Sequence, residues 1–270
     1  MKNNLLNQIK KNKKYKFISD AVVKKEIKDY LKDNKNASEK KAIKYIRSKL
    51  HKTYSVFQTK KKKKINNLLE ELKKTKTKKE FLEIINNLLS SVISTKERLK
   101  EYPLIYKNIF KITGNPKTIT DLGAGLNPFS TPYMNLKKLK YNSYDIDEND
   151  IKLLNKFFKI IKIKGKASIL DIRDNSKISN LPPTDIIFLF KVIDLIDNKN
   201  HKPSEELINQ LIKKTKFIVV SFATKTVTRK EMNFPDRKWF ELMLERNSLK
   251  FKNFQTENEI FYVISKTYLN

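Results

Sequence analysis

The sequence predicts an α/β protein in which an all-helical N-terminal domain precedes a Rossmann-like domain. The first 105 residues contain no Gly and a single Pro, and their apolar residues recur at intervals of three and four, as on one face of a helix. After Asn115-Pro116, short β-rich runs alternate with helical stretches, which is typical of a parallel sheet covered by helices. We therefore predict a helical domain over residues 1–105 and an α/β domain over residues 106–270.

The elements of both domains follow from their apolar patterns. The spacing of apolar residues in the first 105 positions predicts about five helices. The residues with helical spacing are Leu5, Leu6 and Ile9; Ile43, Ile46 and Leu50; Leu68, Leu69 and Leu72; and Phe81, Ile84, Ile85, Leu88 and Leu89. Strand-like runs lie at 118–121, 142–146, 167–171, 185–190 and 217–222, with a final pair within 251–268. The runs 186–190 and 217–220 are continuously apolar, as expected of central strands that helices cover on both faces.

The charge of the chain points to a polyanionic partner. It carries 59 Lys and Arg against 29 Asp and Glu, a formal net charge of +30. The first hundred residues hold 30 of the basic and 10 of the acidic side chains, so the excess is concentrated in the predicted helical domain. Nucleic acid is the favoured partner, and the basic run Lys60–Lys64 favours phosphate contact. Two alternatives stay open: the Lys excess can reflect an A/T-rich genome, and such a run can be a solvated surface.

Some classes of protein are disfavoured by residues that the chain lacks. It has no Cys, which excludes disulfides, thiolate metal sites and iron–sulfur clusters, and its two His residues offer little for a zinc site, so we expect no metal. No apolar run reaches the length of about 18 residues that suggests a membrane span, and the basic start has no apolar core long enough for a secretion signal. We expect a cytoplasmic monomer that does not contact a membrane.

Two of the four glycines stand in the stretch TDLGAGLNPF at residues 120–129. In a doubly wound sheet, the turn after the first strand is where the backbone comes nearest to a ligand. Thr118–Asp121 would supply that strand, Gly123 and Gly125 the close turn, and a helix would begin near Asn127-Pro128. A lone GxG can equally be an ordinary tight turn, so its interpretation depends on the residues around it.

Acidic residues end the next two predicted strands. Asp145 follows Asp121 by 24 residues and could accept hydrogen bonds from two ribose hydroxyls, whereas Asp171 could reach an adenine amino group. A dinucleotide fingerprint would need a third Gly where Pro128 stands, which disfavours NAD. The DxGxG turn followed by strand-end acids is similar to the cofactor site of class I S-adenosylmethionine methyltransferases. A nucleic-acid methyltransferase would account for both halves of the chain.

Further stretches along nearly the whole chain carry a resemblance to one family. They are KLHKTY at 49–54, STKERL at 94–99, DLGAGLNPFSTPYM at 121–134, YDIDEND at 144–150, FLFK at 188–191 and SFATKT at 221–226. These resemble motifs of the 16S rRNA guanine-N7 methyltransferases known from aminoglycoside resistance, most specifically in the LNP turn and the Ser-Thr-x-Glu-Arg segment. The resemblance implies S-adenosyl-L-methionine as cofactor and, as substrate, 16S rRNA in the assembled small ribosomal subunit, gripped by the basic helical domain.

The resemblance also implies roles for individual residues. The implied cofactor-binding residues are His51, Arg98, Asp121, Gly123, Ala124, Gly125, Asp145, Ile146, Asp171 and Ile172. Among these, Arg98 would hold the methionine carboxylate with His51 nearby, while the acids of the second and third strands would bind ribose and adenine. On the target-base side, the implied residues are Lys191, Lys225 and Glu241. Each of these side chains also has an ordinary surface or packing role as its alternative.

The chemistry of guanine N7 suits this set of residues. The N7 lone pair can attack a sulfonium methyl group without a base, so that positioning and a stabilising field suffice. Cytosine-C5 methylation would need a Cys nucleophile, which the chain lacks. Departures from the family pattern lie at Ala124, Ala223, Ile193-Asp194 and Glu231-Met232, mostly on the substrate side. Another RNA nucleotide, a ribose hydroxyl, a housekeeping role and a non-catalytic ribosome-binding factor therefore stay open as alternatives.

Overall fold

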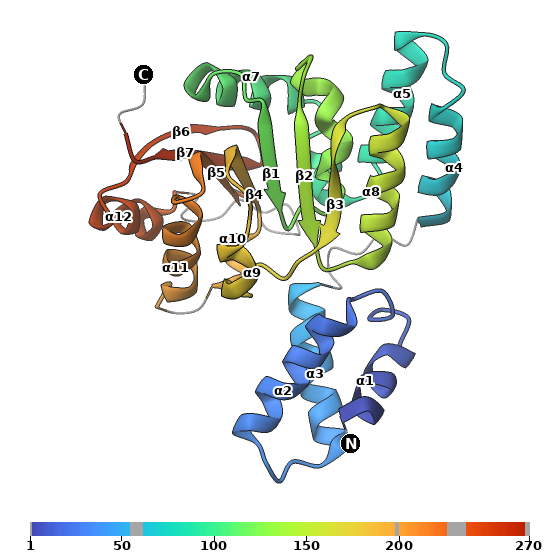
Figure 1. Ribbon diagram of the computed structural model, residues 1–270, viewed down its shortest axis with the longest axis vertical. Helices are drawn as coiled ribbons and strands as arrows, with labels where there is room; N and C mark the ends of the chain where they lie inside the picture. Colours follow the sequence, from blue (N-terminus) through green and yellow to red (C-terminus); the bar gives the residue numbers. More distant parts are fainter. Residues whose placement is uncertain (1, 55–61, 198–199, 226–235, 268–270) are drawn as a thin grey trace.

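The computed structural model describes residues 2–54, 62–197, 200–225 and 236–267 and consists of a seven-stranded sheet with helices on both faces and a small helical body beside it (Figure 1). The strand order is β3-β2-β1-β4-β5-β7-β6, and only the pairs made by β7 are antiparallel. The strands are β1 (Thr118–Leu122), β2 (Lys140–Asp145), β3 (Lys164–Ile169), β4 (Thr184–Phe190), β5 (Thr215–Ala223), β6 (Lys250–Gln255) and β7 (Glu259–Ser265). Each overlaps a predicted run, and the predicted α/β fold is confirmed.

Successive side chains of the central strand β4 divide the core between the two faces of the sheet. Ile186, Phe188 and Phe190 pack in one cluster and Ile187 and Leu189 in the other, because neighbouring residues of a strand point to opposite faces. The first cluster includes residues of α4 (Lys62–Leu72), α5 (Lys78–Leu89), α7 (Tyr102–Thr113), η2 (Asn127–Met134) and α8 (Glu148–Ile160). The second includes residues of α9 (Asn175–Ser179), α10 (Ile193–Ile196), α11 (Lys202–Leu211) and α12 (Lys238–Arg246).

The first three helices form a body with a core of its own. They are α1 (Lys2–Lys11), α2 (Asp20–Asp33) and α3 (Glu39–Thr53), and we call them the helical body. Leu5, Ile9, Val23, Ile27 and Ile46 are among its buried residues. The prediction of one helical domain over residues 1–105 needs correction, because α4 and α5 pack with the sheet and not with these helices. Helical periodicity identifies an apolar stripe but does not say which surface that stripe buries.

The helical body lies against the carboxyl end of β2 (Figure 1). Ile18 forms an isolated antiparallel bridge with Asp147. Around this bridge, the backbone N–H of Ser19 donates to the carbonyl oxygen of Ile146 at 2.9 Å, and the N–H of Glu148 donates to that of Phe17 at 3.0 Å. The basic helices are thereby joined to the loop that follows one of the predicted ligand-binding acids.

Candidate functional site

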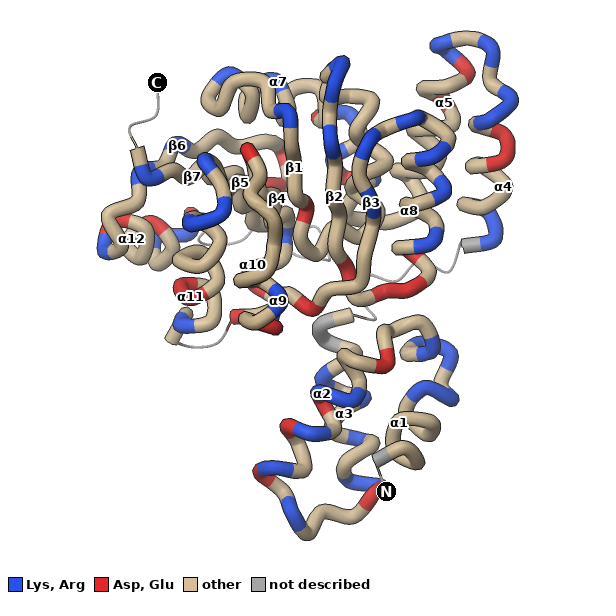
Figure 2. Tube along the Cα trace, in the orientation of Figure 1, with Lys and Arg blue, Asp and Glu red and all other residues tan. Residues whose placement is uncertain are grey.

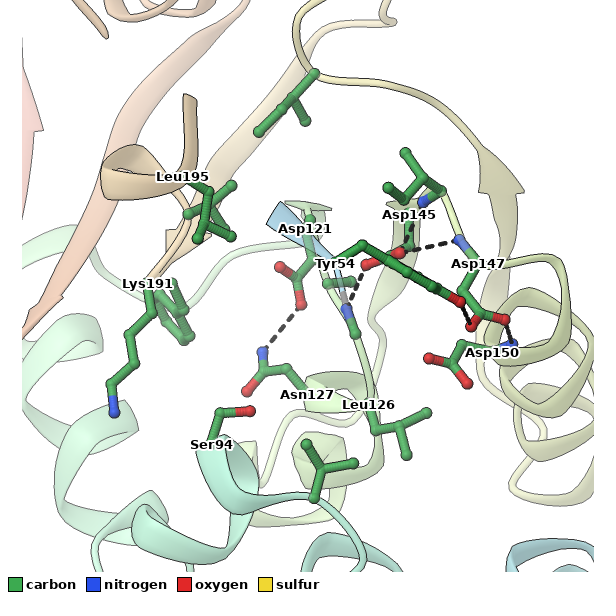
Figure 3. A pocket seen from close by; sticks show the side chains of 18 of the residues that line it. Tyr54, Ser94, Asp121, Leu126, Asn127, Asp145, Asp147, Asp150, Lys191 and Leu195 are labelled. Atoms are coloured by element: carbon green, nitrogen blue, oxygen red, sulfur yellow. Dashed lines mark hydrogen bonds between the residues drawn. The ribbon is translucent and has the colours of Figure 1, made fainter. Parts of the chain in front are cut away.

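A pocket opens at the carboxyl ends of β1 to β4, where a doubly wound sheet binds its ligand (Figure 3). The sequence-predicted residues that line it are Arg98, Asp121, Gly123, Ala124, Gly125, Asp145, Ile146, Asp171, Ile172 and Lys191. Tyr54, which follows α3, adds a side chain from the N-terminal part of the chain, and α6 (Ile93–Glu97) adds Ser94 and Thr95. Motifs that are far apart in the sequence thus surround one cavity.

The two glycines of the turn after β1 share a left-handed backbone conformation but differ in what surrounds them. Their φ angles are 66° at Gly123 and 48° at Gly125, in the left-handed region that favours residues without a Cβ atom. A Cβ atom at Gly123 would lie 2.9 Å from both methyl groups of Val192. A Cβ atom at Gly125 would meet nothing within 4 Å. The main chain at Gly125 therefore borders open space, where a ligand can approach it.

Asp145 is held at the end of β2 by three backbone donors. Its Oδ2 accepts a hydrogen bond from the N–H of Gly125 at 2.8 Å. Its Oδ1 accepts from the N–H groups of Ile146 at 2.7 Å and Asp147 at 3.1 Å. Burial raises the pKa of Asp145, and these hydrogen bonds partly oppose the rise. Since a carboxylate has about four lone-pair sites, Asp145 keeps acceptor capacity for about one further hydrogen bond, such as one from a ribose hydroxyl.

Asp121 is a buried carboxylate between the glycine turn and the sheet. Its Oδ2 accepts hydrogen bonds from Asn127 Nδ2 at 2.9 Å and from the Tyr141 hydroxyl at 2.6 Å. Burial raises its pKa from 3.8 to about 6, although both hydrogen bonds favour the charged form. A ligand with positive charge near this carboxylate would relieve part of that desolvation penalty.

Arg98 directly follows α6 and lines the pocket. Its side chain is 3% exposed, and its Nε donates to Glu259 Oε1 at 2.6 Å. The guanidinium carbon lies 5.2 Å from the centroid of the Phe190 ring. Burial opposes the charge, but Glu259 raises the pKa of Arg98 above its ordinary value. Its Nη2 is buried without a hydrogen-bond partner among the described residues, so an acceptor supplied by a ligand would satisfy it.

Asp171, after β3, is paired within the protein. Arg173 donates to its Oδ1 from Nε at 2.9 Å and to its Oδ2 from Nη2 at 2.7 Å. Burial raises the pKa of Asp171, but the bonds from Arg173 outweigh this effect and lower it. Arg173 also pairs with Glu26 of α2, which Lys49 contacts at 2.7 Å. A chain of alternating charges thus runs from the helical body to the pocket.

Lys191 directly follows β4 and has a left-handed φ of 57°. Its ammonium group lies 2.9 Å from Glu97 Oε2 and 3.1 Å from Glu259 Oε1. The side chain lines the pocket, but its charge is balanced by carboxylates of the protein. A role of Lys191 toward a target base therefore stays a prediction.

A sequence profile described as "Ribosomal RNA methyltransferase (FmrO)" matches residues 11–263. The chain belongs to this family. The FmrO-type assignment confirms the sequence prediction of an rRNA methyltransferase, and with it an enzyme that takes S-adenosylmethionine as cofactor and ribosomal RNA as substrate. The pocket fits that cofactor, since Arg98 Nη2 needs an acceptor such as a carboxylate and Asp145 can accept from a ribose.

Curated relatives and solved structures agree with the FmrO assignment. Relatives named "16S rRNA (guanine(1405)-N(7))-methyltransferase" include one from Micromonospora echinospora, 27% identical over 187 residues, and one from Proteus mirabilis, 26% identical over 243 residues. These alignments cover 67% and 84% of this chain and 66% and 85% of the relatives. The fold is shared with RmtF in complex with S-adenosyl-L-homocysteine, at a TM-score of 0.82, 21% identity and 98% coverage of both chains. It is shared too with the 16S rRNA methylase RmtB, at a TM-score of 0.77, 19% identity and 99% coverage of both.

Three residues implied by the resemblance do not line the pocket of this FmrO-type methyltransferase. His51 is exposed on α3, and Tyr54, three residues later in the same KLHKTY stretch, lines the pocket instead. Lys225 pairs with Glu257 at 3.1 Å. Glu241 lies on α12, where its Oε1 accepts from the Tyr262 hydroxyl at 3.0 Å. Neither side chain is among the described residues that line this pocket, so cofactor contact by His51 and a pocket-shaping role of Glu241 stay predictions.

Sequence reasoning missed several residues of the pocket. Asp147 and Asp150 belong to the YDIDEND stretch that identified Asp145, and Asp147 caps α8 by accepting from the N–H groups of residues 149 and 150. Their proximity in the sequence was a usable signal. Arg173 and Phe190 also lie close to predicted residues, Asp171 and Lys191, but their contacts with Glu26 and Arg98 join residues far apart in the chain and left no signal in the sequence. None of the described helices is long and apolar enough to cross a membrane.

Proposed function

We propose that the chain transfers the methyl group of S-adenosylmethionine to N7 of a guanine in 16S rRNA within the assembled small ribosomal subunit. The observation that carries this proposal is the buried Nη2 of Arg98, which has no hydrogen-bond partner among the described residues and belongs to a pocket that Asp145 also lines. The names of the curated relatives support guanine N7 of 16S rRNA as the target.

In this proposal, each end of the cofactor meets a different part of the pocket. Arg98 would donate from Nη2 to the methionine carboxylate, and Asp145 would accept from the ribose hydroxyls. Gly125 would let the cofactor pass close to the main chain. Asp171, already oriented by Arg173, would accept from the adenine amino group, with Ile172 beside it. These contacts bind and orient; they do not move protons.

The chemical step needs little else from the protein. When bound, S-adenosylmethionine supplies a methyl group activated by its sulfonium. The N7 lone pair would form the new N–C bond as the S–C bond broke, so that the positive charge would pass from sulfur to the guanine and no proton would be lost. The protein contributes alignment of the two reacting atoms and exclusion of water. No general base is required by this step.

Recognition of the RNA would fall mainly to the helical body. Residues 1–54 carry 17 Lys and Arg against 5 Asp and Glu, and Figure 2 shows their blue segments on α1, α2 and α3. This body joins the protein beside the pocket, so phosphates bound to it would bring the RNA close to the cofactor. We propose that the protein acts as a cytoplasmic monomer on an assembled subunit whose shape it reads.

A second candidate is methylation of another RNA position by the same cofactor site. The observation that favours it is the departure from the family pattern at Ala124, Ala223 and Ile193-Asp194, of which Ala124 lines the pocket. A ribose 2′-hydroxyl or a different base would then take the place of guanine N7.

Transfer of tritium from labelled S-adenosylmethionine tests the proposal. Purified small subunits, free 16S rRNA and tRNA are incubated with the wild type and with Asp145→Ala, and the labelled nucleosides are identified after digestion. We expect label on the subunits only, as 7-methylguanosine, and none with the variant. Label on another nucleoside would favour the second candidate, and no label on any RNA would contradict both.

A further inference from the structure

We propose that Glu259 is a positioning residue for the cofactor: it fixes the guanidinium plane of Arg98 so that Nη2 points to the carboxylate of S-adenosylmethionine. The inference deepens the proposed function and rests on it. Glu259 does not line the pocket, so it acts through Arg98 and not by contact with the cofactor.

Glu259 is buried at the first position of β7, with 1% of its surface exposed. Its Oε1 accepts from Arg98 Nε at 2.6 Å and lies 3.1 Å from Lys191 Nζ. Its Oε2 accepts from the Ser221 hydroxyl at 2.8 Å. Because β7 runs antiparallel to β5 with Ala223 opposite Glu259, the carboxylate lies at the end of the sheet where the pocket opens. Both oxygens are therefore occupied, and the carboxylate cannot rotate freely.

The contacts of Glu259 leave one orientation for the guanidinium of Arg98. One edge is tied through Nε to Glu259, and one face lies over the Phe190 ring. A guanidinium is planar, with its donors in a fixed fork, so fixing one edge and one face also fixes the direction of Nη2. Nη2 is the donor that stays buried and unpartnered among the described residues.

The charge balance of the cluster suits the amino acid end of the cofactor. Arg98 and Lys191 supply two positive charges, and Glu97 and Glu259 supply two negative ones. The ligand end that enters carries one ammonium and one carboxylate, so it adds no net charge to a buried site. An uncompensated buried charge would be costly. Loss of the Glu259 charge would leave the cluster with a net charge of +1 and Arg98 without its anchor.

The test measures by calorimetry the affinities of the wild type and of Glu259→Gln for two ligands. S-adenosylhomocysteine carries the amino acid end, and 5′-methylthioadenosine carries the same adenosine and a thioether but lacks that end. We expect the variant to weaken S-adenosylhomocysteine about tenfold and to leave 5′-methylthioadenosine within about twofold. Equal weakening of both ligands, or weakening of neither, would overturn the inference. Glu257→Gln is the matched control, because Glu257 is 73% exposed and two residues away, and both affinities should stay unchanged.

A double-mutant cycle asks whether Glu259 acts through Arg98. In an Arg98→Ala background, Glu259→Gln should have no further effect on S-adenosylhomocysteine affinity, and independent, additive losses would overturn the inference. Ser221→Ala, which removes one hydrogen bond to Glu259, should show the same ligand selectivity with a smaller loss and serves if Glu259→Gln does not fold. A wild type that binds neither ligand would reject the proposed function as well, whereas unselective variants of a binding wild type would reject this inference alone.

Discussion

Three carboxylates at the ends of neighbouring strands have different electrostatic surroundings, and these surroundings set their roles. Burial raises the pKa of Asp121 and Asp145, while the bonds from Arg173 lower that of Asp171. Asp145 is oriented by main-chain donors and Asp171 by one guanidinium. Internal pairing therefore outweighs burial at Asp171, whereas at Asp121 and Asp145 burial outweighs the hydrogen bonds that the protein supplies.

Asp121→Asn should stabilise the ligand-free protein at neutral pH. The native carboxyl has a pKa of about 6 against 3.8 for the free group, so its charged form disfavours folding above pH 6 by roughly 1–3 kcal/mol. This penalty on the free energy of folding shrinks as the pH falls from 6 toward 4, because in this range the carboxyl is protonated in the native state and still ionised in the unfolded state. Urea unfolding at pH 7.5 and pH 5 should show a stability gain of the variant that is larger at the higher pH. An equal gain at both values would contradict the assigned pKa.

Asp145→Asn should weaken binding of both S-adenosylhomocysteine and 5′-methylthioadenosine, by roughly tenfold to a hundredfold. Each oxygen of Asp145 accepts from a main-chain N–H, so an amide NH₂ group in either position would face a donor. Both ligands contain the ribose, so neither should escape the loss. A loss confined to S-adenosylhomocysteine would show that Asp145 serves the amino acid end instead. Asp174→Asn, at a carboxylate that caps α9, is the control.

At this scale the sequence predicted those side chains that belong to a local pattern. The strand-end acids and the glycine pair follow each other at spacings that a Rossmann-like domain imposes. Glu259 lies 161 residues from Arg98 and stands alone in the apolar run EIFYVIS. Its partners are decided by sheet order and strand register, which no spacing in the sequence records.

At the scale of elements, the helical body and the sheet are joined by paired charges beside the pocket. Glu26 of α2 is 3% exposed and accepts from both Arg173 and Lys49. Tyr54, directly after α3, donates from its hydroxyl to Asp147, the residue that caps α8. The amphipathic patterns predicted these helices, but they did not show that α1 to α3 pack together while α4 and α5 pack with the sheet. Their stripes are alike, and only packing distinguishes a stripe buried among helices from one buried on a sheet.

Glu26→Gln should loosen this junction and affect the cofactor site. The variant leaves Arg173 without one of its two carboxylate partners, and we expect unfolding free energy to fall by about 1–3 kcal/mol. Affinity for S-adenosylhomocysteine should fall a few fold, because Arg173 orients Asp171. Thermal unfolding and calorimetry measure the two effects. Asp29→Asn, exposed on the same helix, should change neither, and an unaltered Glu26→Gln protein would show that the junction does not support the pocket.

At the scale of the whole molecule, acidic and basic residues are distributed unevenly. Carboxylates gather at the carboxyl ends of β1 to β3, beside the pocket, whereas blue segments dominate the helical body and the amino ends of β2 and β3 (Figure 2). The net charge was evident from composition, and composition alone cannot separate a phosphate-binding surface from a general excess of Lys. The two basic regions provide a way to separate them, since one adjoins the pocket and the other lies at the opposite end of the sheet.

Salt dependence of binding to small ribosomal subunits tests which basic region contacts RNA. The test variant changes Lys24, Lys28, Lys41 and Lys44 to Gln, and the control variant changes Lys137, Lys138, Lys164 and Lys166 to Gln; all eight are exposed. If each Lys of the helical body neutralises a phosphate, the slope of log affinity against log salt should fall by about 3 in the test variant, because fewer counterions are released. The control variant carries the same loss of charge and should keep the wild-type slope. Equal changes in both variants would mean that the excess of Lys acts as a diffuse charge, and the helical body would then have no special part in holding the subunit.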